Sequence, residues 1–275
     1  MKAVTITFIG CGNMGRSLIG GLIANGHPAA KICAADIDAS QLARVGKLFS
    51  VKVSTDNREA VAAADVIVLA VKPLLIGTVA RDLAGSIQKR TALVISIAAG
   101  VPITALERWL GEDTPIVRAM PNTPAQVNAG VAALFANQAV SAPQRETAAS
   151  IMRSVGLALW LGEESQMDTV TALSGSGPAY FFLIMEALED AAVKLGLSRD
   201  AAHLMTLQTA FGAAKMALEC GEDTATLRMQ VTSPGGTTEQ ALKVLLEGEL
   251  PVLFLEALKA ARARAQELAS SIRDP

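Results

Sequence analysis

A complete GxGxxG pattern near the start of the chain is the first group of residues that could bind a ligand. It consists of Gly10, Cys11, Gly12, Asn13, Met14 and Gly15. The pattern follows a β-branched run at residues 4–9 and opens a helical pattern at residues 14–25, which is the context that dinucleotide binding requires. We expect Gly10 to allow a tight turn, Gly12 to let the backbone approach a pyrophosphate, and Gly15 to let helix and strand pack closely. The alternative is a structural glycine turn in an unrelated α/β fold.

A second glycine motif, TSPGGTTEQ at residues 232–240, precedes an apolar-periodic run at residues 241–246. Its candidate ligand-binding residues are Ser233, Gly235, Gly236, Thr237 and Thr238. Backbone N–H groups, hydroxyls and the positive end of a helix dipole together form a site for an anion such as a carboxylate. An ordinary capped helix, with a Ser or Thr cap and Glu239 in its first turn, is the alternative. A plain cap needs neither two glycines nor several hydroxyls, so the pattern favours the carboxylate site.

Asp36 is the candidate reader of the adenosine ribose. It lies 36 − 10 = 26 positions beyond Gly10, slightly further than the usual interval, at the end of an expected strand at residues 32–35. A carboxylate there would accept hydrogen bonds from both ribose hydroxyls and repel a 2′-phosphate, and no Arg or Lys immediately follows. Taken literally, this favours NAD over NADP. The alternative is that Asp36 or Asp38 caps the following helix.

Two further segments end expected strands and are candidates for contact with the same cofactor. They are Ala70, Val71, Lys72 and Pro73 after one strand, and Ala98, Ala99 and Gly100 after the next. In open parallel sheets, ligands bind beyond the carboxyl ends of the strands. Asn57 is a further candidate at the start of a helix. A solvated loop lysine is the alternative for Lys72, and helix capping is the alternative for Asn57.

Strand and helix patterns alternate through the first part of the chain. We predict strands at residues 4–9, 32–35, 51–53, 66–71, 92–97 and 116–119, edge strands at 130–136 and 157–161, and helices at 14–25, 40–48, 57–63, 103–110 and 142–154. Repeated strand–helix units imply right-handed crossovers and a parallel sheet. The predicted fold class is therefore α/β: a Rossmann-like, doubly wound parallel sheet.

The strand signal stops after about Gly162, and helical patterns follow at residues 178–195, from Ser198 to about Glu219, from about Thr237, and at 252–272. The first two are apolar nearly all round, as helices are when they are buried in a large core or against another chain. We therefore predict a dinucleotide-binding domain at residues 1–162 and an all-helical substrate-binding and dimerisation domain at 163–275.

The composition excludes several classes of protein. The 275 residues carry a net charge of −2 without a block of like charge, which argues against nucleic-acid binding. The three cysteines, Cys11, Cys33 and Cys220, form no CxxC pair and are expected to be reduced thiols. We find neither an apolar run of membrane-spanning length nor a signal-peptide cleavage site, and no metal-ligand cluster. A cytoplasmic protein is expected.

The motifs together resemble one enzyme family. Residues 231–238 and the helix after them are similar to the signature of pyrroline-5-carboxylate reductases. Segments 8–14 (FIGCGNM), 70–73 (AVKP), 118–124 (RAMPNTP) and 173–180 (LSGSGPAY) resemble the same family, in order and at fitting distances. The resemblance covers nearly the whole chain.

The resemblance implies the last step of proline biosynthesis, in which the cyclic imine 1-pyrroline-5-carboxylate is reduced to L-proline with NADPH or NADH. It also implies homodimers through intertwined C-terminal helices, often assembled into decamers. Glu164 matches a family position near the substrate, and a solvated loop acid is the alternative. One departure concerns Asp36, which stands where many relatives carry small or basic residues and so argues against a preference for NADPH.

The residues suit the chemistry of imine reduction, which needs a hydride from the nicotinamide and a proton on nitrogen. A protonated iminium is already electrophilic, so a positioned hydroxyl suffices, and most of the acceleration comes from proximity. We expect Thr238 to orient the ring nitrogen, while the N–H groups of Gly236, Thr237 and Thr238 and the Ser233 hydroxyl hold the carboxylate. Other catalysts are scarce: His27 lies in a loop, and His203 lies in an apolar helix where a satisfied core histidine is expected.

Two alternatives stay open. One is a β-hydroxyacid dehydrogenase or a reductase of another imine; the former needs a lysine acid/base on the long helix, where Lys194 is the only lysine of residues 180–195 and lies near the end. The other is a non-catalytic NADPH-binding sensor, which the fold alone does not exclude. A sensor has no need of a carboxylate site, so the second glycine motif disfavours it.

Overall fold

The computed structural model describes residues 4–272 and divides into two compact units. The first unit runs to Ser176 and includes the chain from Ala261 onward, and the second is Gly177–Ala260. The predicted division at residues 162 and 163 falls earlier along the chain than this boundary. The first unit therefore also contains η3 (Glu164–Gln166), α7 (Met167–Val170) and the π-helical turn η4 (Thr171–Gly175).

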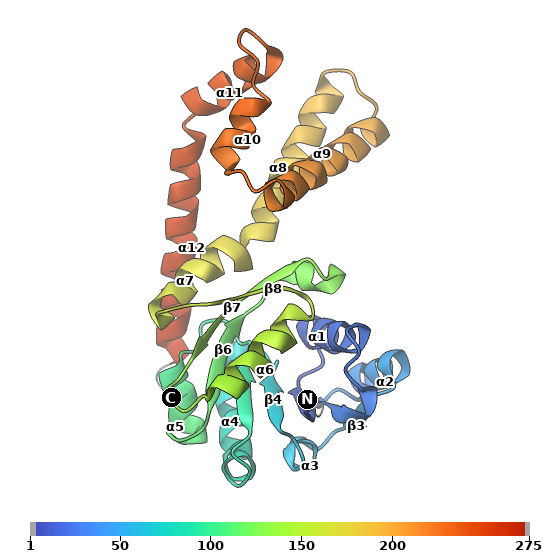
Figure 1. Cartoon of the computed structure of the whole chain (residues 1–275), viewed down its shortest axis with the longest axis vertical. Coiled ribbons are helices and arrows are strands. Elements are labelled where there is room, and N and C mark those ends of the chain that lie inside the picture. Colours follow the sequence, from blue (N-terminus) through green and yellow to red (C-terminus); the bar gives the residue numbers. More distant parts are fainter. Residues whose placement is uncertain (1–3, 273–275) are drawn as a thin grey trace. The chain divides into compact units, whose positions relative to one another are not determined.

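An eight-stranded sheet forms the centre of the first unit (Figure 1). Its strands are β1 (Ile6–Ile9), β2 (Ile32–Ala35), β3 (Lys52–Ser54), β4 (Val66–Leu69), β5 (Leu93–Ser96), β6 (Ile116–Met120), β7 (Gly130–Ala136) and β8 (Gly156–Trp160). Their order is β3-β2-β1-β4-β5-β6-β7-β8, and neighbours pair in parallel except β6 with β7. The chain order reverses between β1 and β4, which is the switch point where open sheets of this kind bind ligands.

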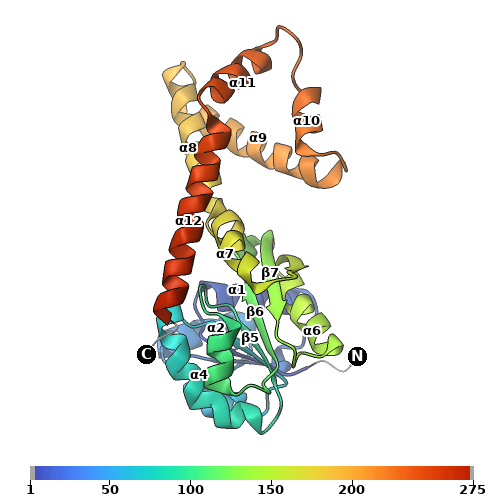
Figure 2. The same ribbon diagram turned by 90° about the vertical axis from the view of Figure 1, so that its left-hand side faces the viewer.

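Helices cover both faces of this sheet (Figures 1 and 2). They are α1 (Asn13–Ala24), α2 (Ala39–Phe49), α3 (Asn57–Val61), α4 (Pro73–Gln88), α5 (Ile103–Leu110) and α6 (Ala142–Arg153). The alternation of side chains along β1 sends Phe8 to one core, shared with α1, α2 and α6, and Ile9 to another, shared with α3, α4 and α5. Burial on both faces explains why the strands read as continuous apolar runs.

Two features of the first unit differ from the prediction, namely the place of β7 in the sheet and the helix α4. Residues 130–136 were expected to be an edge strand, but β7 lies between β6 and β8, so of the two expected edge strands only β8 lies at an edge of the sheet. β7 runs antiparallel to β6 because a short connection, which contains η2 (Thr123–Val127), replaces a helical crossover. The long helix α4 was not predicted. Its Gly77 lowers helix propensity, but the ring of Trp109 would lie only 3.1 Å from an added Cβ there, so close packing requires the glycine.

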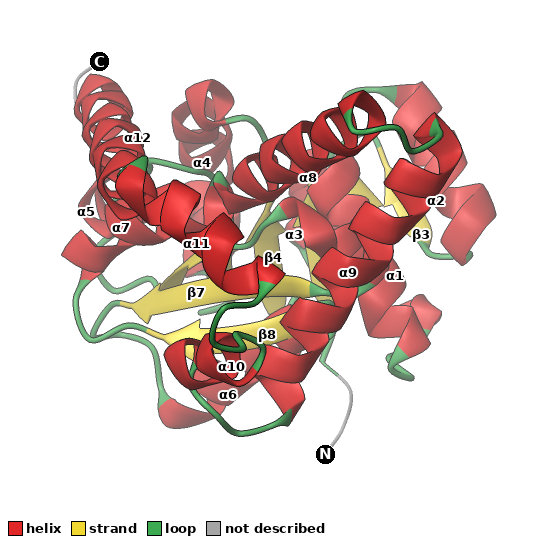
Figure 3. Cartoon of the chain, turned by 90° about the horizontal axis from the view of Figure 1, so that it is seen from above, coloured by secondary structure: helices red, strands yellow, loops and turns green. Residues whose placement is uncertain are grey.

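The described residues of the second unit form helices and loops only (Figure 3). The helices are α8 (Gly177–Lys194), α9 (Arg199–Glu219), α10 (Thr224–Gln230), α11 (Thr237–Glu247) and α12 (Leu250–Ile272), the last of which continues into the first unit. Ser198 caps α9 by accepting the N–H of Ala201, as predicted, whereas α10 was not predicted. Within residues 4–272, no helix has the length and apolarity to cross a membrane.

Candidate functional site

The glycine-rich loop lies at the carboxyl end of β1, beside the end of β4. Gly10 has a φ of +99°, and an added Cβ there would lie 2.6 Å from the carbonyl oxygen of Ala70. An added Cβ at Gly15 would lie 2.5 Å from the carbonyl oxygen of Gly10, so the helix and the loop are in close contact. At Gly12, by contrast, an added Cβ would meet nothing within 4 Å. The backbone of Gly12 therefore borders an open space, as a pyrophosphate cradle requires.

The first N–H groups of α1 are available to a ligand. Gly12 is the N-cap of α1, and its carbonyl accepts the N–H of Arg16. Across residues 4–272, no protein acceptor bonds the N–H groups of Gly12, Asn13 and Met14. These donors and the positive end of the helix dipole suit a phosphate, so the loop fits a dinucleotide cofactor.

The carboxylate of Asp36 contacts the glycine-rich loop. Its Oδ2 accepts the N–H of Cys11 at 2.7 Å, and its Oδ1 accepts the N–H of Asp38 at 2.9 Å. The cap of α2 is Asp38, which accepts the N–H groups of Ser40 and Gln41. Hydrogen bonds from Ser40 lower the pKa of Asp38 below its usual value. Of the two predicted alternatives, helix capping therefore belongs to Asp38, and Asp36 lies against the candidate phosphate loop.

Two other predicted cofactor residues lie nearby in the same unit. Cys11 is fully buried, its thiol donates to the carbonyl oxygen of Ala35 at 3.6 Å, and burial raises its pKa to about 12. Asn57 is the first residue of α3, but Asp56 caps that helix. The Oδ1 atom of Asn57 is buried and has no hydrogen-bond partner among the described residues. An orphaned buried acceptor of this kind is accounted for if a ligand hydroxyl donates to it.

The loops after β4 and β5 hold the remaining candidates. Lys72 is exposed and is the N-cap of α4, and Pro73 is the first residue of that helix. Ala98 is buried, and Gly100 has a φ of +76°. Both loops follow the carboxyl ends of their strands. The structure therefore places them at the same end of the parallel strands as the glycine-rich loop.

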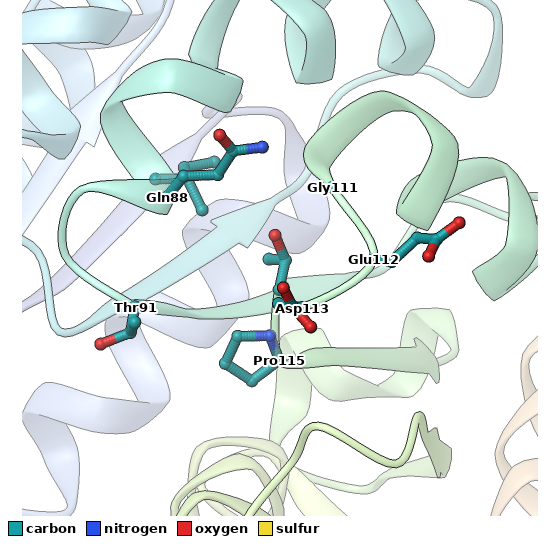
Figure 4. Close-up of a pocket in the computed structure, with 8 residues that line it drawn as sticks. Gln88, Thr91, Gly111, Glu112, Asp113 and Pro115 are labelled. Atoms are coloured by element: carbon teal, nitrogen blue, oxygen red, sulfur yellow. The ribbon is translucent and has the colours of Figure 1, made fainter.

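A separate cavity of about 310 Å³ lies near the amino ends of the strands, away from the glycine-rich loop (Figure 4). Gln88 and Gly111 line it, with Thr91 and Pro115, which precede the amino ends of β5 and β6. Ligands of doubly wound sheets bind at the carboxyl ends. The cavity therefore does not belong to the candidate cofactor site.

The second glycine motif forms a tight turn before α11. Gly236 is the N-cap, Gly235 has a φ of +73°, and the N–H of Gly236 donates to the carbonyl oxygen of Ser233 at 3.0 Å. The N–H of Gly235 donates to the Glu239 carboxylate at 2.9 Å. The predicted alternative of a Ser or Thr cap is therefore wrong. Throughout residues 4–272, no acceptor bonds the N–H groups of Thr237 and Thr238, which remain available to a carboxylate.

Glu164 is not a solvated loop acid. Its Oε1 accepts from Arg118 Nη1 and from the N–H of Ile103, both at 2.8 Å. Arg118 lies in β6 and is only 6% exposed. Sequence reasoning assigned Arg118 no role of its own; a lone arginine within the apolar run of β6 was the available signal, since such a charge is seldom buried without a partner.

The two histidines differ from each other. Burial lowers the pKa of His27, and its Nε2 has no partner among the described residues. His203 was expected in a core, but it is exposed within its unit and its Nδ1 lies 3.0 Å from Glu189. The core environment expected for His203 is not found within the single chain, because the helices of the second unit bury few side chains there.

Known proteins similar to this chain agree with one another. Residues 164–268 match the family described as pyrroline-5-carboxylate reductase dimerisation, and residues 5–100 match the one described as NADP oxidoreductase coenzyme F420-dependent. A pyrroline-5-carboxylate reductase of Pseudomonas aeruginosa is 52% identical over 99% of both chains. A solved pyrroline-5-carboxylate reductase from Coxiella burnetii has a TM-score of 0.95 and 50% identity, covering 98% of this chain and 99% of that one. The Plasmodium falciparum pyrroline carboxylate reductase, solved with NADP bound, has a TM-score of 0.86 and 31% identity, covering 98% of this chain and 99% of that one.

Proposed function

The chain belongs to the pyrroline-5-carboxylate reductase family, and we propose that it reduces the cyclic imine 1-pyrroline-5-carboxylate to L-proline with NADPH or NADH. This reaction is the last step of proline biosynthesis. The observation that carries the proposal is the turn before α11, where unpartnered N–H groups and threonine hydroxyls lie together at a helix N-terminus. A substrate that carries a carboxylate beside its imine matches this turn.

The residues divide the work as follows. The N–H groups of Thr237 and Thr238, with the hydroxyl of Ser233, hold the carboxylate. The N–H of Gly236, which was expected to join them, instead donates to the carbonyl oxygen of Ser233 within the turn. Gly235 supplies the left-handed backbone that the turn requires. The Thr238 hydroxyl orients the imine nitrogen, so it is the candidate catalytic group. Because the protonated imine is already electrophilic, orientation supplies most of the acceleration.

The cofactor would be held by the first unit and, when bound, supplies the hydride. Gly10, Cys11, Gly12, Asn13, Met14 and Gly15 would hold its pyrophosphate. Asp36 and Asn57 would contact the adenosine ribose, and Ala70, Val71, Lys72, Pro73, Ala98, Ala99 and Gly100 would border the rest. The open space at Gly12 and the unpartnered N–H groups of α1 support this assignment.

Assembly and location are part of the proposal. Large apolar side chains cover α8 and α9, including Phe181, Phe182, Leu204 and Phe211, each more than 60% exposed in the single chain. Surface of this kind is covered by another chain in a stable protein. We therefore propose a homodimer through the C-terminal helices, with each active site completed by the partner, further assembly of dimers into a decamer, and a cytoplasmic location. The division into domains at 1–162 and 163–275 belongs to the same proposal.

Oxidation of NADPH and NADH with and without 1-pyrroline-5-carboxylate tests the function. We expect imine-dependent oxidation with L-proline as the product. The matched control is 1-pyrroline, which has the same ring without the carboxylate and should be reduced far less well. Equal rates with both imines would contradict the carboxylate site, and no imine-dependent oxidation with either cofactor would contradict the proposed reaction.

A further inference from the structure

We propose that Arg118 and Glu164 are positioning residues that hold the loop at residues 97–102 in place for the cofactor. This inference rests on the proposed function, because that loop contains the candidate cofactor residues Ala98, Ala99 and Gly100. It gives Glu164 a different role from substrate binding. The loop connects β5 to α5, and the ion pair is connected to both of its ends.

The first end of the loop is fixed through the sheet. Ser96 is the last residue of β5, and in the parallel pairing of β5 with β6 it lies in register with Arg118. The Ser96 hydroxyl is buried and accepts the N–H of Ala98 in a long hydrogen bond of 3.4 Å. The position of Arg118 on β6 is therefore tied to the point where the loop leaves the sheet.

The second end of the loop is fixed by Glu164. Ile103 is the first residue of α5, so its N–H has no acceptor within the helix. Glu164 Oε1 accepts this N–H at 2.8 Å and also accepts from Arg118 Nη1 at 2.8 Å. One carboxylate oxygen thus joins the start of α5 to β6, and the negative charge lies at the favourable end of the α5 dipole.

The ion pair between Arg118 and Glu164 is largely buried, so removing either charge should disturb the residues around it. The side chain of Arg118 is 7% exposed and that of Glu164 is 23% exposed, so the two charges are screened much less than those of surface pairs. When one partner of a buried pair is removed, the other is left as an uncompensated charge that moves or draws in water. Such a shift would displace Ile103 and with it the loop. The backbone of Gly100, at a φ of +76°, belongs to this loop.

Four variants separate the parts of the pair. Glu164→Gln keeps an oxygen that accepts the Ile103 N–H but removes the charge, and Glu164→Leu removes both. Arg118→Lys keeps the positive charge, and Arg118→Met removes it. The matched control is Glu146→Gln, which breaks the exposed ion pair between Glu146 and Arg153 on α6.

The measurements are the Kd of NADH from the change in its fluorescence without imine, the KM of the imine at saturating NADH, and the Tm. We expect Glu164→Leu and Arg118→Met to raise the Kd of NADH about tenfold, with a smaller rise for Glu164→Gln and Arg118→Lys, and little change in imine KM. The control should change none of these values. Since NADH binding is measured without imine, a failure of the proposed reaction would be seen separately.

Two results would overturn the inference. If the Glu164 variants raise the imine KM and leave the Kd of NADH unchanged, Glu164 is a substrate ligand. If every variant lowers only the Tm, while NADH affinity and imine KM stay at wild-type values, the pair has a structural role alone. Should Arg118→Met fail to fold, Arg118→Lys and Glu164→Gln, which keep the packing and part of the hydrogen bonding, still decide between these outcomes.

Discussion

The carboxylate of Asp36 accepts the N–H of Cys11 at 2.7 Å, so the acid after β2 lies directly against the glycine-rich loop after β1. A second N–H, from Asp38, fixes its other oxygen. The negative charge is thus held where the adenosine ribose is expected, and a 2′-phosphate at that position would be repelled. We predict substantial activity with NADH, and that Asp36→Ser raises the kcat/KM ratio of NADPH to NADH by about one order of magnitude or more.

The measurement is kcat/KM for each cofactor at saturating imine, for wild type and the variant. The matched control is Asp38→Ala, which removes the side-chain cap of α2 but no group that contacts the glycine-rich loop. It should lower stability and leave the cofactor ratio near that of wild type. A wild type that ignores NADH, or a ratio that Asp36→Ser does not shift, would show that Asp36 does not read the ribose.

Gly12→Val tests the phosphate loop. An added Cβ at Gly12 would meet no protein atom within 4 Å, so the folded protein tolerates it sterically. The branched side chain would instead fill the space into which the pyrophosphate must come. We predict a large rise in the KM of NAD(P)H with an unchanged circular dichroism spectrum. Unchanged cofactor affinity in the folded variant would rule out the fingerprint assignment.

The sequence predicted the architecture of the first unit well because its strands are buried on both faces. The expected strand at residues 32–35 and the helix at 103–110 have the predicted bounds. α4 was missed because Gly77 obscures the helical pattern, and its reason, contact with Trp109, lies elsewhere in the chain. The position of β7 between β6 and β8 could not be predicted from local sequence patterns either, because a strand's neighbours depend on the path of the connections before and after it.

The sequence predicted the candidate site less completely where tertiary contacts determine which partner a side chain has. The spacing predicted the glycine-rich loop from local chemistry alone. It did not separate the roles of Asp36 and Asp38, because both lie at the start of a helix and only the fold brings one of them to Cys11. The pairing of Arg118 with Glu164 spans 46 positions, so no local pattern indicates it.

Alkaline pH should destabilise the protein partly through Cys11. Burial, followed by the charge of Asp36, raises the pKa of this thiol from 9.0 to about 12. The favourable contribution of the neutral buried thiol is complete below pH 9 and is lost as the pH rises from 9 towards 12, because the unfolded chain releases the proton first. The loss amounts to at most about 1.4 kcal/mol per pH unit in that range.

Urea unfolding at pH 8, 9.5 and 10.5 measures this effect. Cys11→Ala should make the fall in the free energy of unfolding above pH 9 shallower than in wild type. The matched control Cys220→Ala removes an exposed thiol and should keep the wild-type slope. If the Cys11→Ala slope equals that of wild type, the thiol of Cys11 is not shielded in the folded protein.

Assembly can be tested on α9. Leu204 is 67% exposed in the single chain and belongs to the apolar surface that we assign to a dimer. A charge placed in an apolar interface is costly unless it is paired. We predict that wild type sediments as a dimer or larger at micromolar concentration, and that Leu204→Glu shifts it towards monomer and lowers activity. A stable, active wild-type monomer would contradict the proposal.

Thr238→Ala tests the candidate catalytic hydroxyl. The cap of α11 is Gly236, so the Thr238 side chain is not needed to cap that helix, and its removal should leave the fold intact. It takes away one hydrogen bond that strengthens as the imine nitrogen gains its proton. A bond of that kind contributes about 1 to 3 kcal/mol, or roughly one to two orders of magnitude in rate. We predict a fall of that size in kcat/KM for the imine, with NAD(P)H binding almost unchanged.

Gly236→Val separates the hydroxyl from the backbone donors of the same turn. An added Cβ at Gly236 would lie 2.9 Å from the carbonyl oxygen of Ser233, so the turn must shift and its N–H groups lose their common direction. Inhibition by L-proline or another cyclic carboxylate should then disappear, whereas in Thr238→Ala it should only weaken, because the backbone donors survive. Wild-type kinetics in Thr238→Ala would mean that water or another group delivers the proton. Intact imine affinity in a folded Gly236→Val protein would mean that this turn is not where the substrate carboxylate binds.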